Sequence, residues 1–559
     1  MMFLHNIRTV ARYESKILYR SWFFKVFSVI AFFLIFWINL AEIIYYQPFV
    51  NYAISANIPY RNLMLLNIGQ SIIAIFLASE FLKRDKKLDT SEVFYVRPLS
   101  NAEYVIGKVW GDLRVFFLLN ILALFIVLIF NFIGKSPIDP SAYVFYFCAL
   151  CIPSLIYIIG LSIFLMLVIN SQAVTFVVLL GYIAMSMFYI DDKFFYLFDY
   201  LGKSIPMMKS DITGYSNIMV ILNQRMIYLL LGIVFILFSI KLFKRLPNSN
   251  KSVRPWFAAG FLFLFIAVLC GYNYIEKTVD LSNKRKLYVK LNNEYIHFPK
   301  IQPESFHISL EQLTDGIRAS AEIIGTAKQN SDKFIFTLNP GFQIHSVTCG
   351  DSSLSYDRLE HLLIVDFGRE FEQGESISLK IEYSGRADES ICYLDIEDDV
   401  FFEKKEVWGF SVDKRYILQS RNYLLLTPES YWYPVPGTSY STVSQDWQEA
   451  LFCDFKLDVK PREGLIPVSS GDVEVGEDGI YHFNPDFPMR ASSVAIGNFE
   501  KLSIDRDSIQ YAIWYVKDKK IILKEYSIQF LIRFLLWSEI LRSVWSGTGG
   551  WTIRSKDFL

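Results

Sequence analysis

The chain has 559 residues, of which 53% are hydrophobic and 20% are charged, and its net charge is −1. This charged fraction is below the roughly 25% of an ordinary soluble domain, and the near-neutral charge gives no indication of a nucleic-acid partner. The long apolar runs fall within residues 1–275, whereas residues 276–520 have a soluble composition, so we expect two regions of different class.

The first 21 residues predict an amphipathic helix. Basic residues alternate with apolar residues at helical spacing, namely Phe3, Leu4, Ile7, Val10, Ala11, Ile17 and Leu18. Such a helix is typical of a segment that lies along the inner membrane surface. A cytosolic extension of the first membrane span is the alternative.

Seven apolar stretches follow, each near the roughly 20 residues that a helix needs to cross a bilayer. They are residues 22–44, 62–82, 115–132, 143–169, 173–190, 226–243 and 256–274. Residues 22–245 form a six-span membrane domain in this interpretation, and residues 246–275 form a basic linker and a seventh span.

Lysine and arginine concentrate in the leader, after the second span and after the sixth span. Since basic residues favour the cytoplasmic side, the N-terminus is predicted to be cytoplasmic in a multi-pass protein of the cell inner (plasma) membrane. Seven crossings then place residues 276–559 outside the cytoplasm.

The basic loop after the second span reads "KRDKKLDTSEVFYVRPLSNAEYVIGK" over residues 83–108. Ser100 or Asn101 is placed to cap a helix whose first turn contains Glu103. The preference of basic residues for the cytoplasm explains the Lys and Arg content, but it does not explain the length of the loop or its helix-start signal.

With Glu80, the basic cluster, the Pro-Ser turn and Gly107-Lys108, residues of about 1–245 resemble the type-2 ABC exporter permeases. The resemblance implies a surface elbow helix, a re-entrant helical piece within residues 191–224, and a cytoplasmic loop that docks a separate ABC-type ATPase. A second permease copy or a paralogue would complete the pore in the lipid bilayer. The residues that this implies for ATPase docking are Lys83, Arg84, Lys86, Lys87, Arg97, Pro98, Ser100, Asn101 and Lys108.

The chain itself offers no ATP-binding motif. A phosphate-binding loop needs G-x-x-x-x-G-K-[ST], and "LGKSIP" supplies Gly202, Lys203 and Ser204, but Leu197 occupies the position of the first glycine. The apolar spans also lack the chains of buried Asp, Glu and His that proton-coupled carriers use.

In residues 276–516 the apolar residues recur with a period of two. Apolar and polar residues alternate in three segments, "KFIFTL", "SISLKIEY" and "CDFKLDV", and a fourth segment, "YAIWYV", is more densely apolar. Turn signals separate these segments. They predict a mainly antiparallel β-sandwich or saddle-shaped sheet.

The motifs "FTLNPGF", "GESISLKIEYSG", "ESYWYPVPG" and "SSVAIGNFEKL" occur in this order. On these motifs, residues of about 300–516 resemble the N-terminal β-domain of zinc aminopeptidases related to aminopeptidase N. Those enzymes bind zinc through H-E-x-x-H. None of the six histidines, His5, His297, His307, His345, His361 and His482, lies in such a motif.

No catalytic or metal-binding residue is therefore predicted. Zinc would be expected only if the catalytic domain of that family were present. Residues 517–559 are expected to form a helix and a truncated tail. Cys148 and Cys151 of "FCALC" are interpreted as apolar filler, and a disulfide among Cys349, Cys392 and Cys453 is left open.

Three functional hypotheses follow. The first is an ABC-type exporter permease with a non-catalytic, peptidase-derived outer domain. The second is a membrane-anchored zinc aminopeptidase without its catalytic half. The third is a membrane-held β-domain that binds a partner.

Overall fold

The computed structural model describes residues 2–45, 54–85, 99–134, 137–191, 193–215, 217–243, 253–401, 405–407, 410–412, 415–445, 447, 449, 452–506 and 509–517. The chain divides into two units. The helical unit contains Met1–Glu294, Ser390–Tyr416 and Tyr440–Val443, and the β unit contains Tyr295–Glu389, Ile417–Ser439 and Ser444–Leu559. The predicted tail from residue 518 onward lies outside the described residues.

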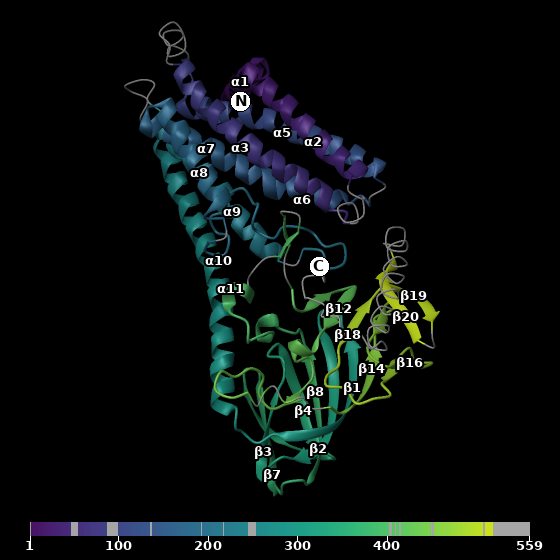
Figure 1. The fold of residues 1–559 in the computed structure, drawn as a ribbon. Coiled ribbons are helices and arrows are strands. Elements are labelled where there is room, and N and C mark those ends of the chain that lie inside the picture. Colours follow the sequence, from purple (N-terminus) through teal and green to yellow (C-terminus); the bar gives the residue numbers. More distant parts are fainter. Residues whose placement is uncertain are drawn as a thin grey trace, which may run out of the picture. The chain divides into compact units, whose positions relative to one another are not determined.

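Helices make up most of the helical unit (Figure 1). They are α1 (Met2–Arg20), α2 (Trp22–Tyr45), α3 (Asn57–Asp85), α5 (Asn101–Ile133), α6 (Pro140–Tyr146), the π-helix η1 (Phe147–Cys151), α7 (Ile152–Ile169), α8 (Gln172–Phe188), α9 (Ile218–Leu242) and α10 (Arg254–Tyr295). A short helix, α11 (Asp398–Phe401), belongs to the same unit.

Six segments among the described residues are long and apolar enough to cross a membrane. They overlap all of the predicted spans except residues 173–190, most of which form α8 (Gln172–Phe188), an apolar helix of 17 residues. The third predicted span differs at its start, because α5 begins at Asn101 and runs without a break to Ile133. The helical unit is therefore a membrane-embedded region.

Buried amide side chains join α2, α3 and α5. Asn39 Nδ2 donates to Asn62 Oδ1 (2.8 Å), Gln70 Nε2 donates to Asn67 Oδ1 (3.0 Å), and Asn120 Nδ2 donates to Gln70 Oε1 (2.8 Å). Hydrocarbon cannot hydrogen-bond these groups, so they stabilise the bundle only when they face one another.

Helix α10 continues for 21 residues beyond Tyr274, where the last predicted span ends. The extension "IEKTVDLSNKRKLYVKLNNEY" is rich in helix-forming residues. The Arg285 guanidinium donates to the backbone oxygens of Cys392 (2.8 Å) and Tyr393 (2.9 Å) and pairs with Asp398 (3.1 Å). These contacts attach the segment after Ser390 to the helix.

The β unit contains an eight-stranded sheet in the order β16-β17-β14-β1-β2-β8-β4-β5. Its strands are β1 (Ile301–Gln312), β2 (Ile317–Ala327), β4 (Phe342–Cys349), β5 (Ser352–Ser353), β8 (Ser376–Gly385), β14 (Asp454–Lys460), β16 (Asp472–Val475) and β17 (Tyr481–Asn484). The β1–β14 pair is parallel, so the sheet is mixed and not wholly antiparallel.

Two four-stranded sheets and two hairpins complete the strands. One sheet, β13-β3-β7-β6, contains β3 (Ser331–Thr337), β6 (Ser355–Leu359), β7 (Leu362–Phe371) and β13 (Val435–Pro436). The other, β11-β12-β18-β15, contains β11 (Leu418–Ser420), β12 (Tyr423–Leu426), β15 (Ile466–Val468) and β18 (Val494–Gly497). The pairs are β9 (Lys405–Val407) with β10 (Phe410–Val412), in the helical unit, and β19 (Phe499–Arg506) with β20 (Ile509–Val516).

Alternation along the strands produces the core of the β unit. In β8, Ile377, Leu379, Ile381 and Tyr383 are buried, whereas intervening residues such as Glu382 are exposed. The four quoted strand segments coincide with β3, β8, β14 and β20, so these strand predictions are confirmed. All six cysteines lie in the described part of the chain, and no disulfide joins them there.

Candidate functional site

The predicted docking loop ends at the first turn of α5, which carries a capping box. Glu103 N–H donates to Ser100 Oγ (3.2 Å), and Ser100 N–H donates to Glu103 Oε2 (2.6 Å). These reciprocal bonds satisfy two backbone donors that a helix start leaves open. The other carboxylate oxygen, Glu103 Oε1, accepts a bond from Asn6 Nδ2 of α1 (2.9 Å). The predicted helix start is confirmed, and α1 helps to fix it.

Two glycines allow α1 to approach α5 closely. A Cβ at Gly107 would lie 2.7 Å from Val10 Cβ, and a Cβ at Gly111 would lie 2.8 Å from Glu14 Cβ. Ser15 Oγ also donates to the Gly111 oxygen (3.0 Å). Small residues at a helix crossing are typical of tight packing between membrane helices.

A buried ion pair lies at the same crossing. Lys108 Nζ of α5 is 3.0 Å from Glu14 Oε2 of α1, and both side chains are about 95% buried. Breaking such a pair by removing one partner is costly, because the other charge stays desolvated. The pair therefore makes the position of α1 on α5 specific.

The start of α5 is also attached to the end of α9. Asn101 Nδ2 donates to the Phe243 oxygen (2.7 Å), and the Tyr104 ring stacks on the Phe243 ring at 5.0 Å. This oxygen lies at the C-terminal end of α9. One turn of α5 is thus held by both α1 and α9.

The predicted docking residues fall into three groups. Ser100, Asn101 and Lys108 come together at the start of α5. Ser100 caps the helix through Glu103, whereas Asn101 bonds to the end of α9 and Lys108 pairs with Glu14 of α1. Lys83 and Arg84 belong to the last turn of α3. Lys86, Lys87, Arg97 and Pro98 lie outside the described residues.

Sequence reasoning did not identify Asn6, Glu14 and Ser15 as partners of this turn. A signal was available, because Glu14 is the only acidic residue in an otherwise basic leader. A lone acid on the apolar side of a basic helix indicates a specific partner.

A second polar centre holds the segment between α8 and α9. The buried Arg225 of α9 donates to the backbone oxygens of Ala149 (2.9 Å) and Tyr200 (2.8 Å) and to Ser154 Oγ (2.7 Å). Ala149 belongs to the π-helix η1, a form of turn that is frequent at functional sites. One guanidinium thus joins α9, the π-helix region and the 190–217 segment.

The re-entrant helical piece expected within residues 191–224 has a different form. Phe194, Phe195 and Tyr196 have φ values of 50°, 57° and 67°, which is a left-handed turn. The Asp199 carboxylate then accepts backbone bonds from Gly202 (2.9 Å) and Ser204 (2.6 Å). Among the described residues up to Asn217, turns replace the expected helix, because backbone N–H groups are satisfied by this carboxylate.

The exposed face of the large β sheet carries an acid between two imidazoles. Asp458 Oδ2 is 2.7 Å from His307 Nε2, and Asp458 Oδ1 is 2.6 Å from His482 Nδ1. Burial raises the pKa of Asp458, but the bonds from both histidines outweigh this effect and leave the pKa below its ordinary value. The bond to Asp458 raises the pKa of His482. In the part of the chain that the structure describes, no group of three or more His, Cys, Asp or Glu is arranged to hold a metal.

No family model matches the sequence, and a comparison with curated proteins finds no significant match. Solved structures of zinc peptidases give distant similarity. An M1 zinc metallopeptidase from Deinococcus radiodurans has 10% identity and a TM-score of 0.30, with 39% of this chain and 48% of that chain covered. A two-domain M1 zinc metallopeptidase mutant bound to L-tryptophan has 12% identity and a TM-score of 0.28, with the same coverage. The chain thus spans about half of the length of the structures it matches.

Proposed function

We propose that this chain is the membrane-embedded subunit of an ATP-driven exporter of the ABC type. A separate ATPase docks on the basic loop of residues 83–112, and a second permease copy or a paralogue completes the pore. The β unit is a non-catalytic domain on the opposite side of the membrane. The chain binds the nucleotide-hydrolysing partner and moves with it.

The observation that carries this proposal is the continuity of α5. The helix starts inside the predicted docking loop and is 33 residues long, so it extends for roughly 50 Å. A force applied at Ser100 acts on the membrane-crossing part of the same rigid helix. A loop that is basic only because Lys and Arg favour the cytoplasmic side would need no such continuous connection to a membrane helix.

The bracing of this helix start supports the same mechanism. Asn6 and Glu14 connect it to α1, and Asn101 connects it to the end of α9. Lys108 is buried against Glu14, so in this proposal it positions α5 and does not itself bind the ATPase. The groups left for direct contact are the basic residues that precede Ser100.

The test is co-purification of the full chain with P-loop ATPases from the same cells. Reversing Lys83, Arg84, Lys86 and Lys87 to Glu is expected to abolish the complex, because four attractive charges become repulsive. The matched control reverses four basic residues on the β strands, Arg318, Lys380, Lys456 and Lys460. Retention of the ATPase by the loop variant would overturn the docking proposal.

A further inference from the structure

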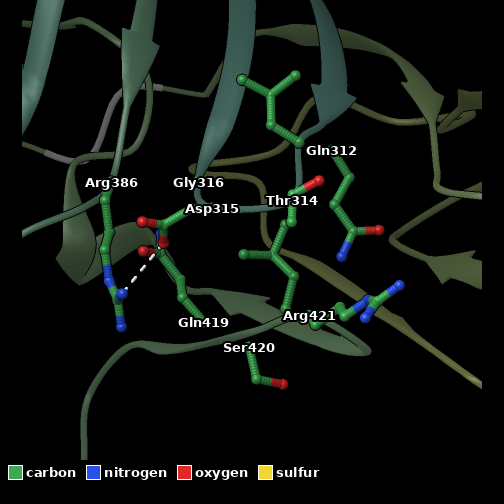
Figure 2. Close-up of a pocket in the computed structure, with 10 residues that line it drawn as sticks. Gln312, Thr314, Asp315, Gly316, Arg386, Gln419, Ser420 and Arg421 are labelled. Atoms are coloured by element: carbon green, nitrogen blue, oxygen red, sulfur yellow. Dashed lines mark hydrogen bonds and ion pairs between the residues drawn. The ribbon is translucent and has the colours of Figure 1, made fainter.

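A small polar pocket lies in the β unit at the turn between β1 and β2. Residues 312–316, Arg386 after β8, and residues of β11 and β12 line it. The cavity volume is about 140 Å³. Figure 2 shows Gln312 and Arg421 on one side of the pocket and the paired Arg386 and Asp315 on the other.

The floor of the pocket carries amide groups without hydrogen-bond partners. Gln312 is only 5% exposed. Its Oε1 accepts a bond from the Arg462 N–H (3.3 Å), which orients the amide, while its Nε2 is buried and unpartnered. Both the Nε2 and the Oε1 of Gln419 are also buried without partners. Native proteins rarely leave such groups unsatisfied, so each one requires an explanation.

The rim of the pocket carries one uncompensated positive charge. Arg386 Nη1 pairs with Asp315 Oδ1 at 3.0 Å, so these two charges offset each other. Arg421 is exposed, and its guanidinium forms no ion pair with any residue that the structure describes. A ligand group near Arg421 is therefore expected to be anionic.

The unsatisfied atoms define what a ligand must offer. Gln312 Nε2, Gln419 Nε2 and the Arg421 guanidinium require acceptors, whereas Gln419 Oε1 requires a donor. A carboxylate supplies the acceptors, and a guanidinium binds it with favourable geometry. An N–H on the adjacent carbon supplies the donor.

The volume limits the ligand to the size of a small residue. A cavity of about 150 Å³ holds benzene, which has six heavy atoms, and alanine has the same number. We propose that this pocket binds an α-carboxylate with its neighbouring N–H, either as a free amino acid or as the C-terminal residue of a peptide. This site is separate from the docking loop and does not depend on the proposed export function.

The test is calorimetric titration of the full chain in detergent with four probes: alanine, N-acetylalanine, N-acetylalanine methylamide and acetate. Alanine or N-acetylalanine is expected to bind in the millimolar range or more tightly, as a ligand of six to nine heavy atoms allows. Tighter binding of alanine would identify a free amino acid, and tighter binding of N-acetylalanine would identify a peptide C-terminus.

Two variants test the assignment of the residues. Arg421→Ala is expected to weaken binding about tenfold or more, because it removes the charged donor. Gln312→Leu removes the orienting amide at nearly constant volume and is expected to abolish binding. Arg490→Ala is the matched control, since Arg490 is exposed in the same unit and lies outside the pocket.

Three results would overturn the proposal. The first is the absence of saturable binding by either carboxylate up to tens of millimolar. The second is equal binding of acetate or of the neutral methylamide. The third is unchanged affinity in Arg421→Ala, an exposed substitution that leaves the core intact and so remains informative if Gln312→Leu fails to fold.

Discussion

The two units of this molecule distribute polar groups in opposite ways. The helical unit exposes large apolar side chains such as Phe265 (61% exposed) and Trp37 (53%), and it buries Gln70, Asn120 and Arg225. The β unit buries Phe334 and Ile381 and exposes charged residues along its strands. In lipid, apolar surface costs nothing to expose, and polar side chains must find partners inside the bundle. In water, burial of apolar surface is the main stabilising contribution.

This contrast teaches that one kind of residue has different roles in the two units. A buried cation or amide in the helical unit holds helices and loops together. The β unit gains little from surface ion pairs, and a polar group that it buries without a partner indicates a cost or a ligand. Three substitutions can test this difference.

The largest effect is expected at Arg225. Arg225→Met would leave the oxygens of Ala149, Ser154 and Tyr200 without this donor and should reduce the free energy of unfolding by about 3–5 kcal/mol. The measurement is denaturant or thermal unfolding of the full chain in detergent. The neighbouring Met226 is exposed, so Met226→Ala serves as the control and should change stability little. Equal stability of the two variants would show that the buried Arg225 guanidinium does not hold the helical unit together.

An intermediate effect is expected at His361, a buried histidine of the β unit. Burial, together with the nearby Arg358 charge, lowers the pKa of His361 to about 3. Because the unfolded chain binds this proton near pH 6.5 and the folded chain does not, stability falls as the pH drops from about 6.5 toward 3. The loss should reach about 2 kcal/mol at pH 5.

Hydrogen exchange of the β7 amides in the full chain, corrected for the intrinsic pH dependence, measures this loss. The His361→Gln variant lacks the titrating group and should show a smaller fall in protection between pH 6.5 and 5. An identical pH dependence in both proteins would contradict the assignment.

The smallest effect is expected on the exposed sheet face. In Asp458→Asn, the pKa of His482 should fall toward the ordinary value near 6.5, because the carboxylate that raises it is gone. The pair stabilises the fold below the raised pKa of His482 and above the lowered pKa of Asp458, so its contribution is greatest at about pH 4–6.5.

A titration of the His482 ring signals by NMR measures this shift. Asp366→Asn is the control, since Asp366 pairs with Lys333 elsewhere in the unit. The change in stability should stay small because these side chains are partly exposed to solvent. A His482 pKa that is unaffected by Asp458→Asn would show that the carboxylate does not hold the ring in solution.

Local patterns predicted the elements of both units well. Ser100 and Glu103 determine the start of α5 through bonds three residues apart, and period-two alternation identifies β3, β8 and β14, since both signals are contained in short stretches of sequence. The parallel β1–β14 pair was not predicted, because its partners are more than 140 residues apart.

The polar centres could not be predicted from short stretches of sequence for the same reason, because their residues are far apart in the chain. Arg225 meets residues of η1 and of the 190–217 segment, and Gln312 shares a pocket with Gln419. Each residue taken alone has an ordinary surface interpretation. Only the fold reveals that their polar atoms are buried together.

The length of α10 has a mechanical consequence. With 42 residues, the helix extends for roughly 63 Å, about twice the 30 Å thickness of the hydrocarbon layer. Membrane helices tilt readily, and a change of about 5° around one end would displace the other end by about 5 Å. Arg285 binds the segment that begins at Ser390 to α10, so this segment would move with the helix. A small change in the tilt of α10 within the membrane would thereby become a larger displacement of the part of the helix that extends beyond the membrane.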